Sequence, residues 1–192
     1  EKLEQLGYHV HVKVLNALDF GLPQKRERIF IIGFQDDIHF KFPKGTGKYR
    51  SLSEVLEPDN EIDPSLFASE QIQQNRLGKI KKQPFYPSIW HENKGGNISM
   101  LPYSCALRAG ASYNYLLVNG VRRLSPREML RLQGFPDDFK IAVSYQAMRK
   151  LTGNSVAVPV IEAVAGQMLE AIRIKKQNTE TKQLSLLESL YA

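Results

Sequence analysis

Cysteine is almost absent from this sequence of 192 residues, because Cys105 is the only one. A single thiol cannot form an internal disulfide, so a disulfide-stapled secreted scaffold is excluded and a reducing compartment is indicated. Cys105 stands between Ser104 and Ala106. We expect it to be a small buried hydrophobic residue rather than a nucleophile.

Long apolar runs and metal-ligand clusters are also missing. No run of about 18 apolar residues occurs, so we expect no membrane span. No secretory signal peptide is recognisable at the start. Histidine is scarce, and His9 and His11 alternate with valines and have no third ligand nearby. We therefore expect both histidines on the solvent side of a strand, and no metal site.

Acidic residues are outnumbered by basic ones, 20 against 26, which gives a formal net charge of +6. This balance fits a polyanionic partner but does not establish one. Hydrophobic residues make up 42% of the chain, which is enough for a core. The length allows one or two small domains.

The most informative segment is residues 24–34. Gln24, Arg26 and Arg28 alternate with Lys25 and Glu27 and lead into an apolar run at residues 29–34. Alternate residues of an extended backbone point to the same side, so one amide and two guanidinium groups converge where a buried strand begins. Such donors suit an electron-rich substrate group, and solvated charges on an edge strand are the alternative.

The remaining elements are predicted from periodicity and capping residues. Residues 9–15 form a strand, and their short connection to residues 28–34 favours antiparallel pairing. Residues 36–120 are rich in Gly, Pro and Lys and indicate a small domain with many loops. Helices are predicted at residues 51–57, 64–76, 126–133 and 145–151 and after residue 154, before a surface tail with an amphipathic stretch at 184–191.

Two further motifs follow, at residues 122–137 and 151–156. Together with residues 16–34, they resemble the last three conserved blocks of the DNA cytosine-5 methyltransferases, in the same order and with a long insert between the first and second. The resemblance covers nearly all of residues 1 to about 175. The family's earlier blocks carry a glycine-rich cofactor loop, a Pro-Cys catalytic loop and a Glu-Asn-Val strand. None of them is found in this sequence.

The resemblance implies an α/β fold: edge strands and the C-terminal helix of a Rossmann-like methyltransferase domain, plus a small loop-rich target-recognition domain. The implied divisions are residues 1–35 for the catalytic strands, 36–150 for target recognition, 151–175 for the returning helix and 176–192 for the tail. We expect the C-terminal part of a larger enzyme. Its missing N-terminal half would be a partner, in the same chain or as a separate subunit.

Site residues are implied in the same way. Arg28 matches the arginine that hydrogen-bonds O2 of a flipped cytosine, Arg26 matches its neighbour at the base, and Gln24 orders the strand entrance. The residues implied to lie beside the methionine part of S-adenosylmethionine are Asn154, Ser155 and Val156. A plain helix cap is the alternative for Asn154.

Bases would be read from the insert. The residues expected to contact DNA are Arg108, Ser112, Tyr113, Asn114 and Ser104, whose side chains suit base edges and phosphates; ordinary polar loop surface is the alternative. Ala106-Leu107 replaces the Thr-Leu pair of many family members, so a threonine contact to phosphate is not expected. Lys79, Lys81 and Lys82 suit either phosphate contacts or solvated charge.

Two functions remain open. The first is part of a DNA (cytosine-5)-methyltransferase that acts on double-stranded DNA in the bacterial cytoplasm, near the nucleoid, within a restriction–modification system, and that is inactive without its other half. The second is a stand-alone DNA-binding module. The motifs at residues 24–28 and 153–155 favour the first, because they serve catalysis and cofactor binding rather than duplex binding.

Overall fold

The computed structural model describes residues 2–191, with side chains described as far as Leu184. Helices and strands are mixed, as predicted for an α/β protein. The chain divides into two compact units. Unit 1 comprises Glu1–Leu15, Arg28–Lys44 and Val160–Ala192, and unit 2 comprises Asn16–Glu27 and Gly45–Pro159.

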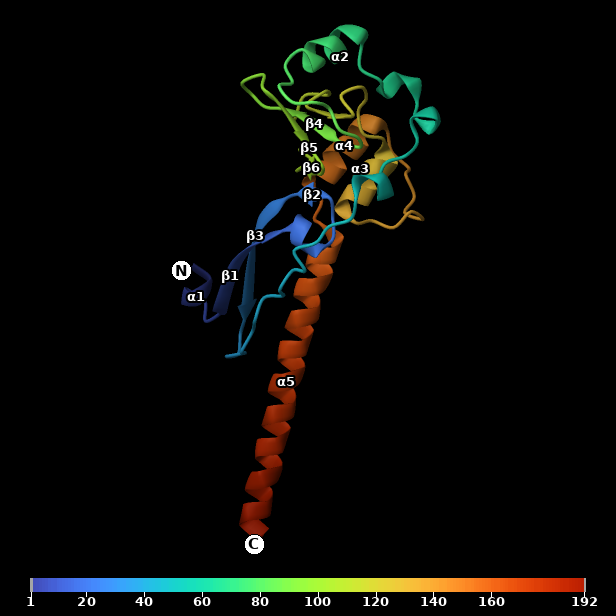
Figure 1. Ribbon diagram of the computed structural model, residues 1–192. Coiled ribbons are helices and arrows are strands. Elements are labelled where there is room, and N and C mark those ends of the chain that lie inside the picture. The colour runs from blue at the N-terminus through green and yellow to red at the C-terminus, as the bar shows by residue number, and fades with distance from the viewer. Residues whose placement is uncertain (1, 192) are drawn as a thin grey trace. The chain divides into compact units, whose positions relative to one another are not determined.

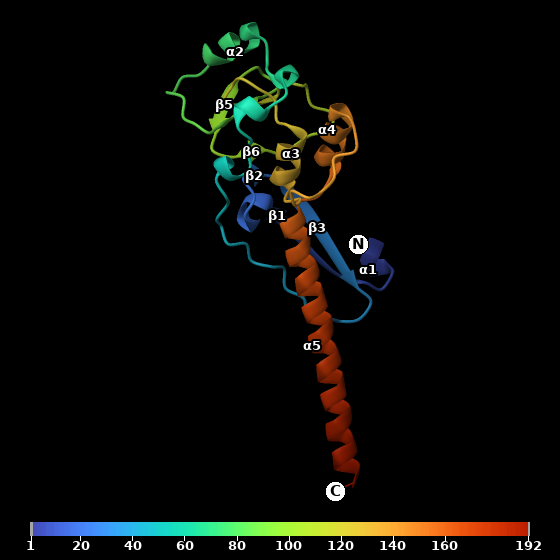
Figure 2. The same ribbon diagram turned by 90° about the vertical axis from the view of Figure 1, so that its right-hand side faces the viewer.

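Unit 1 contains a two-stranded sheet and a long helix. Strands β1 (His9–Asn16) and β3 (Glu27–Phe34) pair with each other, and β3 runs back along β1 (Figure 1). The short helix α1 (Lys2–Gln5) precedes them. Helix α5 (Val158–Tyr191) is one continuous helix in both views (Figure 2), so the predicted surface tail is helical. The predicted amphipathic stretch at 184–191 lies largely outside the described side chains.

The core of unit 1 is aromatic. Phe34, Ile38 and Phe40 are buried together with Ala171 of α5. His11 also belongs to this side of the sheet, because its ring lies 5.3 Å from that of Phe40. The prediction that His11 faces solvent was therefore wrong.

The opposite side of the sheet is apolar and exposed. Val12 and Val14 of β1 and Ile29 and Ile31 of β3 are all more than half exposed. The strand predicted to be buried after Arg28 is therefore exposed on this face. Within the described residues only one face of this sheet is covered.

One apolar helical stretch also differs from expectation. Tyr145–Leu184 is long and apolar enough to cross a membrane by length and composition, with a mean hydropathy of 1.4 in one 18-residue window. A core helix gives the same signal. Met168 and Ala171, which lie in this stretch, pack against the aromatic cluster of unit 1.

Unit 2 is built around a three-stranded antiparallel sheet in the order β5-β4-β7. The strands are β4 (Ile89–Glu92), β5 (Ile98–Leu101) and β7 (Leu116–Val118). A separate parallel pair joins β2 (Gln24–Lys25) to β6 (Ser104–Cys105). The strand entrance is thereby fixed beside a segment about eighty residues later in the chain.

The helices of unit 2 largely follow the capping signals. Helix α3 (Pro126–Gln133) begins at a capping box, in which Ser125 and Glu128 bond each other's backbone N–H groups, and it ends at Gly134 with φ +85°. A short 3-10 turn, Leu52–Glu54, has a second capping box. Both starts were predicted. Helix α4 (Tyr145–Asn154) runs three residues further than predicted.

The predicted helix at 64–76 is broken into two pieces. A 3-10 turn (Pro64–Leu66) comes first, and helix α2 (Glu70–Leu77) follows. Between them the Ala68 N–H donates to the Val121 carbonyl at 2.9 Å. This non-local backbone bond holds the segment extended, and a local helix signal cannot reveal it.

A buried ion pair holds the start of α3 to the loop before it. Arg122 and Glu128 are both essentially inaccessible, and two guanidinium nitrogens donate to the two carboxylate oxygens at 2.9 Å. Arg122 Nε also donates to Asp59 at 2.6 Å. Burial alone would lower the pKa of Arg122, but the hydrogen bonds and charges of Glu128 and Asp59 outweigh it and raise that pKa.

Removing one partner of this pair tests its structural role. Glu128→Gln leaves the Arg122 charge buried without its bidentate partner, so the free energy of unfolding should fall by about 3 kcal/mol. Urea unfolding followed by the fluorescence of the single tryptophan, Trp90, measures this. Glu54→Gln alters the exposed capping box at Ser51 and should cost about 1 kcal/mol or less. Equal losses in the two variants would contradict the assigned role.

Candidate nucleic-acid interface

Gln24 is completely buried in unit 2 and uses both ends of its amide. Its Nε2 donates to the Leu132 carbonyl at 2.8 Å. Its Oε1 accepts from the Leu107 N–H at 3.2 Å. An amide side chain is needed here because it offers a donor and an acceptor together. Gln24 thus joins the strand entrance to the end of α3 and to the segment around Leu107.

Arg26 is 3% exposed and points its guanidinium at backbone carbonyls. Nη1 donates to Leu107 O at 3.1 Å, and Nη2 donates to Gly153 O at 3.2 Å and to Ser155 O. These bonds join the strand entrance to two other segments of unit 2, one at Leu107 and one at the end of α4. These contacts give Arg26 a positioning role within unit 2, and its predicted place at the base stays a prediction.

Arg28 differs from the other two members of the alternating motif. It lies on β3 in unit 1 and its side chain is exposed. Gln24 and Arg26 are buried, whereas Lys25 and Glu27 between and after them are exposed. The predicted alternation holds over residues 24–27.

Gly153 allows the end of α4 to touch the segment after Leu107. A Cβ placed on Gly153 would lie 2.3 Å from Ala109 N and 2.8 Å from the Arg108 carbonyl carbon. Any side chain would push this backbone away. The sequence predicted only a helix stop at Gly153, whereas α4 continues to Asn154.

The three residues predicted at the cofactor follow directly. Asn154 is exposed and is the last residue of α4, so the alternative that it caps α5 is wrong. Ser155 donates its hydroxyl to Thr152 O at 3.1 Å, and its own carbonyl accepts from Arg26. Val156 is half exposed. The exposed amide of Asn154 and the half-exposed side chain of Val156 therefore lie next in sequence to the two carbonyls that Arg26 hydrogen-bonds.

Arg108 lies in the predicted DNA-contacting loop, where it begins the stretch 108–115, and it is exposed. Its backbone N–H donates to the Tyr115 hydroxyl at 3.0 Å, and its guanidinium lies 4.9 Å from the centre of the Tyr115 ring. Burial raises the pKa of Tyr115. Both ends of the loop are thus held together while Arg108 faces solvent.

A family profile described as C-5 cytosine-specific DNA methylase matches residues 1–170 of this chain. The chain belongs to this family. The Type II methyltransferase M.NgoBI of Neisseria gonorrhoeae is 66% identical over 163 residues, which cover 85% of this chain and 51% of that protein. M.HaeII of Haemophilus aegyptius is 57% identical over 189 residues, which cover 98% and 59%. The chain therefore spans about half to three fifths of the length of these relatives.

Solved structures show the same fold at low identity. A DNMT2 mutant of Spodoptera frugiperda superposes with a TM-score of 0.64 at 18% identity, covering 88% of this chain and 60% of that one. A putative DNA modification methyltransferase encoded within a prophage of E. coli gives 0.61 at 20% identity, covering 90% and 63%. The methyltransferase fold and the family resemblance are confirmed. The predicted domain boundaries and site residues stay predictions.

Tyr113 is the more exposed of the two tyrosines in this loop, and two arginine side chains lie over its ring. Its ring stacks on Tyr145 of α4 at 6.3 Å and 23°. The guanidinium of Arg149 lies 4.1 Å from the Tyr113 ring centre, and that of Arg123 lies 5.6 Å from both rings. Arg149 also donates to the Ser112 carbonyl at 3.0 Å. The loop is therefore presented in a fixed form, with Ser112 and Tyr113 exposed.

Sequence reasoning missed Tyr145 and Arg149. They are four residues apart on α4, so they share one face of the helix, and this spacing is the signal that could have found them. Beside them lies a concave site of about 480 Å³. Its lining residues are Ala109, Gly110, Ala111, Tyr113, Ser144, Gln146, Ala147, Arg149 and Lys150.

Two predicted residues are less exposed than Ser112 and Tyr113. Ser104 is fully buried in β6, and its hydroxyl donates to the neighbouring carbonyl of Cys105 at 2.8 Å. Asn114 is half buried, and its backbone carbonyl accepts a hydrogen bond from the buried Arg76 guanidinium. The burial of Ser104 argues against a base contact, and the contact predicted for Asn114 stays a prediction. Burial also raises the pKa of the Cys105 thiol, so it stays protonated and unsuited to nucleophilic attack.

Gly153→Ala tests the close approach. The added methyl group overlaps backbone atoms, so unit 2 should lose about 2 kcal/mol of stability and the loop after Leu107 should become less protected from hydrogen exchange. Gly166→Ala is the matched control, because a Cβ on this α5 glycine meets nothing within 4 Å. The control should gain up to about 1 kcal/mol. Urea unfolding and amide exchange read both variants, and a neutral Gly153→Ala would contradict the packing.

Proposed function

We propose that this chain supplies the DNA-recognition part and one wall of the active site of a DNA (cytosine-5)-methyltransferase. The complete enzyme would transfer a methyl group from S-adenosylmethionine to a flipped cytosine in a specific duplex site of a bacterial restriction–modification system. The observation that carries this proposal is the bonding of Gln24 and Arg26. These two side chains bring the strand entrance, the end of α3, the loop after Leu107 and the end of α4 together in one unit.

The residues near Asn154 suit the cofactor. An exposed amide and the half-exposed Val156 lie at the C-terminal end of α4. The partial negative charge of a helix C-terminus favours the sulfonium and ammonium groups of S-adenosylmethionine. The bound cofactor would supply the methyl group. Asn154 would orient it, and the backbone at Ser155 is held in place by Arg26.

Arg28 would act on the base itself. Attack at C6 of cytosine places negative charge on the ring, including O2, and a positioned guanidinium donor there can contribute about 3 kcal/mol to catalysis. The cytosine must first leave the duplex, at a cost of a few kcal/mol. We place the thiol nucleophile and the carboxylate that protonates N3 in the remainder of the enzyme.

The exposed face of β1 and β3 fits that remainder. Val12, Val14, Ile29 and Ile31 form an apolar surface on a sheet of only two strands. Because the chain spans about half to three fifths of its relatives' length, we assign this face to the N-terminal half, whether in one chain or as a second cytoplasmic subunit. A stand-alone DNA-binding module, the alternative, would need no such face.

Methyl transfer tests the proposed role of Arg28. Arg28→Ala should lower the single-turnover rate of the complete enzyme on the order of 100-fold, because the donor to O2 is lost. Arg28→Lys should recover only part of it, since lysine lacks the planar fork. Arg173→Ala removes an equal charge from an exposed site on α5 and should leave the rate unchanged. The chain by itself should transfer nothing, and turnover by it would refute the proposed division of the active site.

Arg108→Ala tests where the sequence is read. Base contacts contribute about 1–3 kcal/mol of discrimination each, so this variant should weaken binding to the cognate duplex more than to random duplex. Lys140→Ala, an equal loss of charge on an exposed segment, should leave the preference for cognate over random duplex unchanged. Competition binding with the complete enzyme measures the ratio. If both duplexes lose affinity equally, the reading residues lie instead within 84–100.

A further inference from the structure

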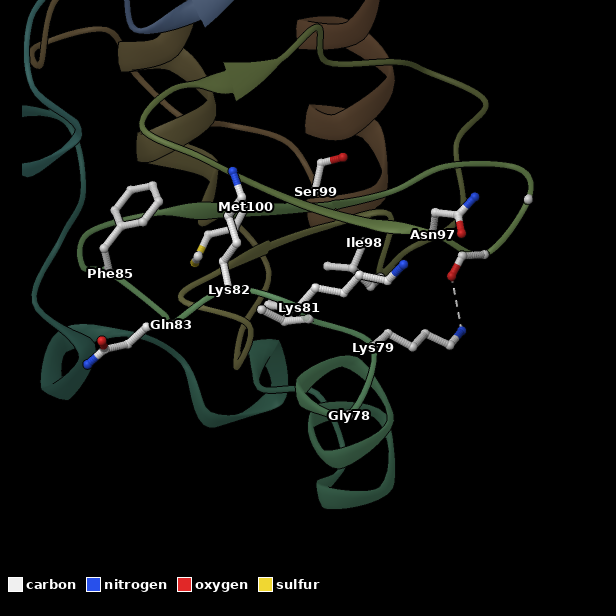
Figure 3. Close-up of a pocket in the computed structure, with 13 residues that line it drawn as sticks. Gly78, Lys79, Lys81, Lys82, Gln83, Phe85, Asn97, Ile98, Ser99 and Met100 are labelled. Carbon is white, nitrogen blue, oxygen red and sulfur yellow. Dashed lines mark hydrogen bonds between the residues drawn. The ribbon is translucent and has the colours of Figure 1, made fainter.

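Unit 2 contains a second concave surface, separate from the loop at 108–115. It is an open groove of about 930 Å³ between the segment after α2 and the β4–β5 hairpin (Figure 3). Its lining includes Lys79, Lys81, Lys82, Phe85, Asn97 and Ser99. Three of these are lysines and none is acidic.

The three lysines are not equivalent. Lys79 donates to the Gly96 carbonyl at 3.1 Å, drawn as the dashed line in Figure 3, and lies 3.7 Å from Glu92. It braces the hairpin, and its charge is partly offset. Lys81 and Lys82 are exposed, and no ion pair is described for either of them within residues 2–184. Their charges are available to a ligand.

The hairpin wall is firmly built. Asn93 Oδ1 accepts from the N–H groups of Gly95 and Asn97 at 2.9 and 3.0 Å, and Gly96 has φ +74°, which favours glycine. Asn97, just before β5, and Ser99 on β5 are exposed, so they present an amide and a hydroxyl group. The groove therefore combines two free cations with neutral hydrogen-bond donors.

We infer that this groove binds the sugar–phosphate backbone of duplex DNA, with Lys81 and Lys82 at phosphates and Asn97 and Ser99 at phosphate or sugar oxygens. The inference rests on the proposed function and deepens it. Lysine acts as a point charge without the planar fork of arginine, so it suits phosphate rather than base edges. A groove for unpaired strands stacks successive bases on several aromatic rings, and Phe85 is the one aromatic residue of this lining.

The groove therefore supplies affinity without sequence preference. This role complements the loop at 108–115, where Arg108 and Tyr113 are presented for specific contacts. Each phosphate contact releases counterions and adds about 0.9 to the slope of log affinity against log salt. Two lysines should account for a slope of about two.

The test is a paired substitution in the complete enzyme. Lys81→Ala with Lys82→Ala should lower affinity for cognate and random duplexes alike, on the order of 10-fold or more near 0.1 M salt, and should reduce the salt slope by about two. Lys48→Ala with Lys140→Ala removes the same charge from exposed sites outside the groove and should leave the slope unchanged. Lys81→Arg with Lys82→Arg should restore binding. Far-UV circular dichroism confirms that every variant is folded.

Several outcomes overturn the inference while the proposed function stands. These are an unchanged salt slope in the alanine pair, an equal slope change in the control pair, a loss confined to the cognate duplex, and a loss confined to single-stranded DNA, which would indicate a groove for unpaired strands. Failure of the unaltered complete enzyme to methylate any duplex cytosine overturns the proposed function instead.

Discussion

The structure of unit 2 depends on one buried charge. The guanidinium of Arg26 is removed from water, and it is compensated by backbone carbonyls from two distant segments. A buried cation that loses such partners is costly. The strand entrance, the loop after Leu107 and the end of α4 must therefore adopt their positions together. Arg26 makes these segments one cooperative element, in which a displacement of one segment weakens the hydrogen bonds that hold the others.

Local chemistry made part of this fold predictable. The spacing of Ser125 and Glu128 predicted the start of α3, and Gly134 predicted its end. The alternation of Gln24 and Arg26 correctly placed two polar side chains on one side of an extended segment. In each case the determining interactions lie within a few residues, or the backbone period alone decides which way a side chain points.

The remainder depends on contacts between distant residues. No local pattern could show that Ala68 bonds Val121, or that Gly153 meets Ala109. The orientation of β1 was misjudged for a related reason. Valine was expected inside and histidine outside, but His11 packs on aromatic rings that arrive from other parts of unit 1. Which face of a strand is buried depends on what covers it, and that information is not in the strand.

The bare side of β1 and β3 also bears on how a cell would make this protein. An exposed apolar face of a sheet attracts other apolar surfaces and is a common origin of aggregation. If the chain were translated apart from the rest of the proposed enzyme, it would have to bind that remainder quickly or rely on chaperones. Synthesis of the two halves in close succession would then be a condition for solubility, independent of any chemistry at the active site.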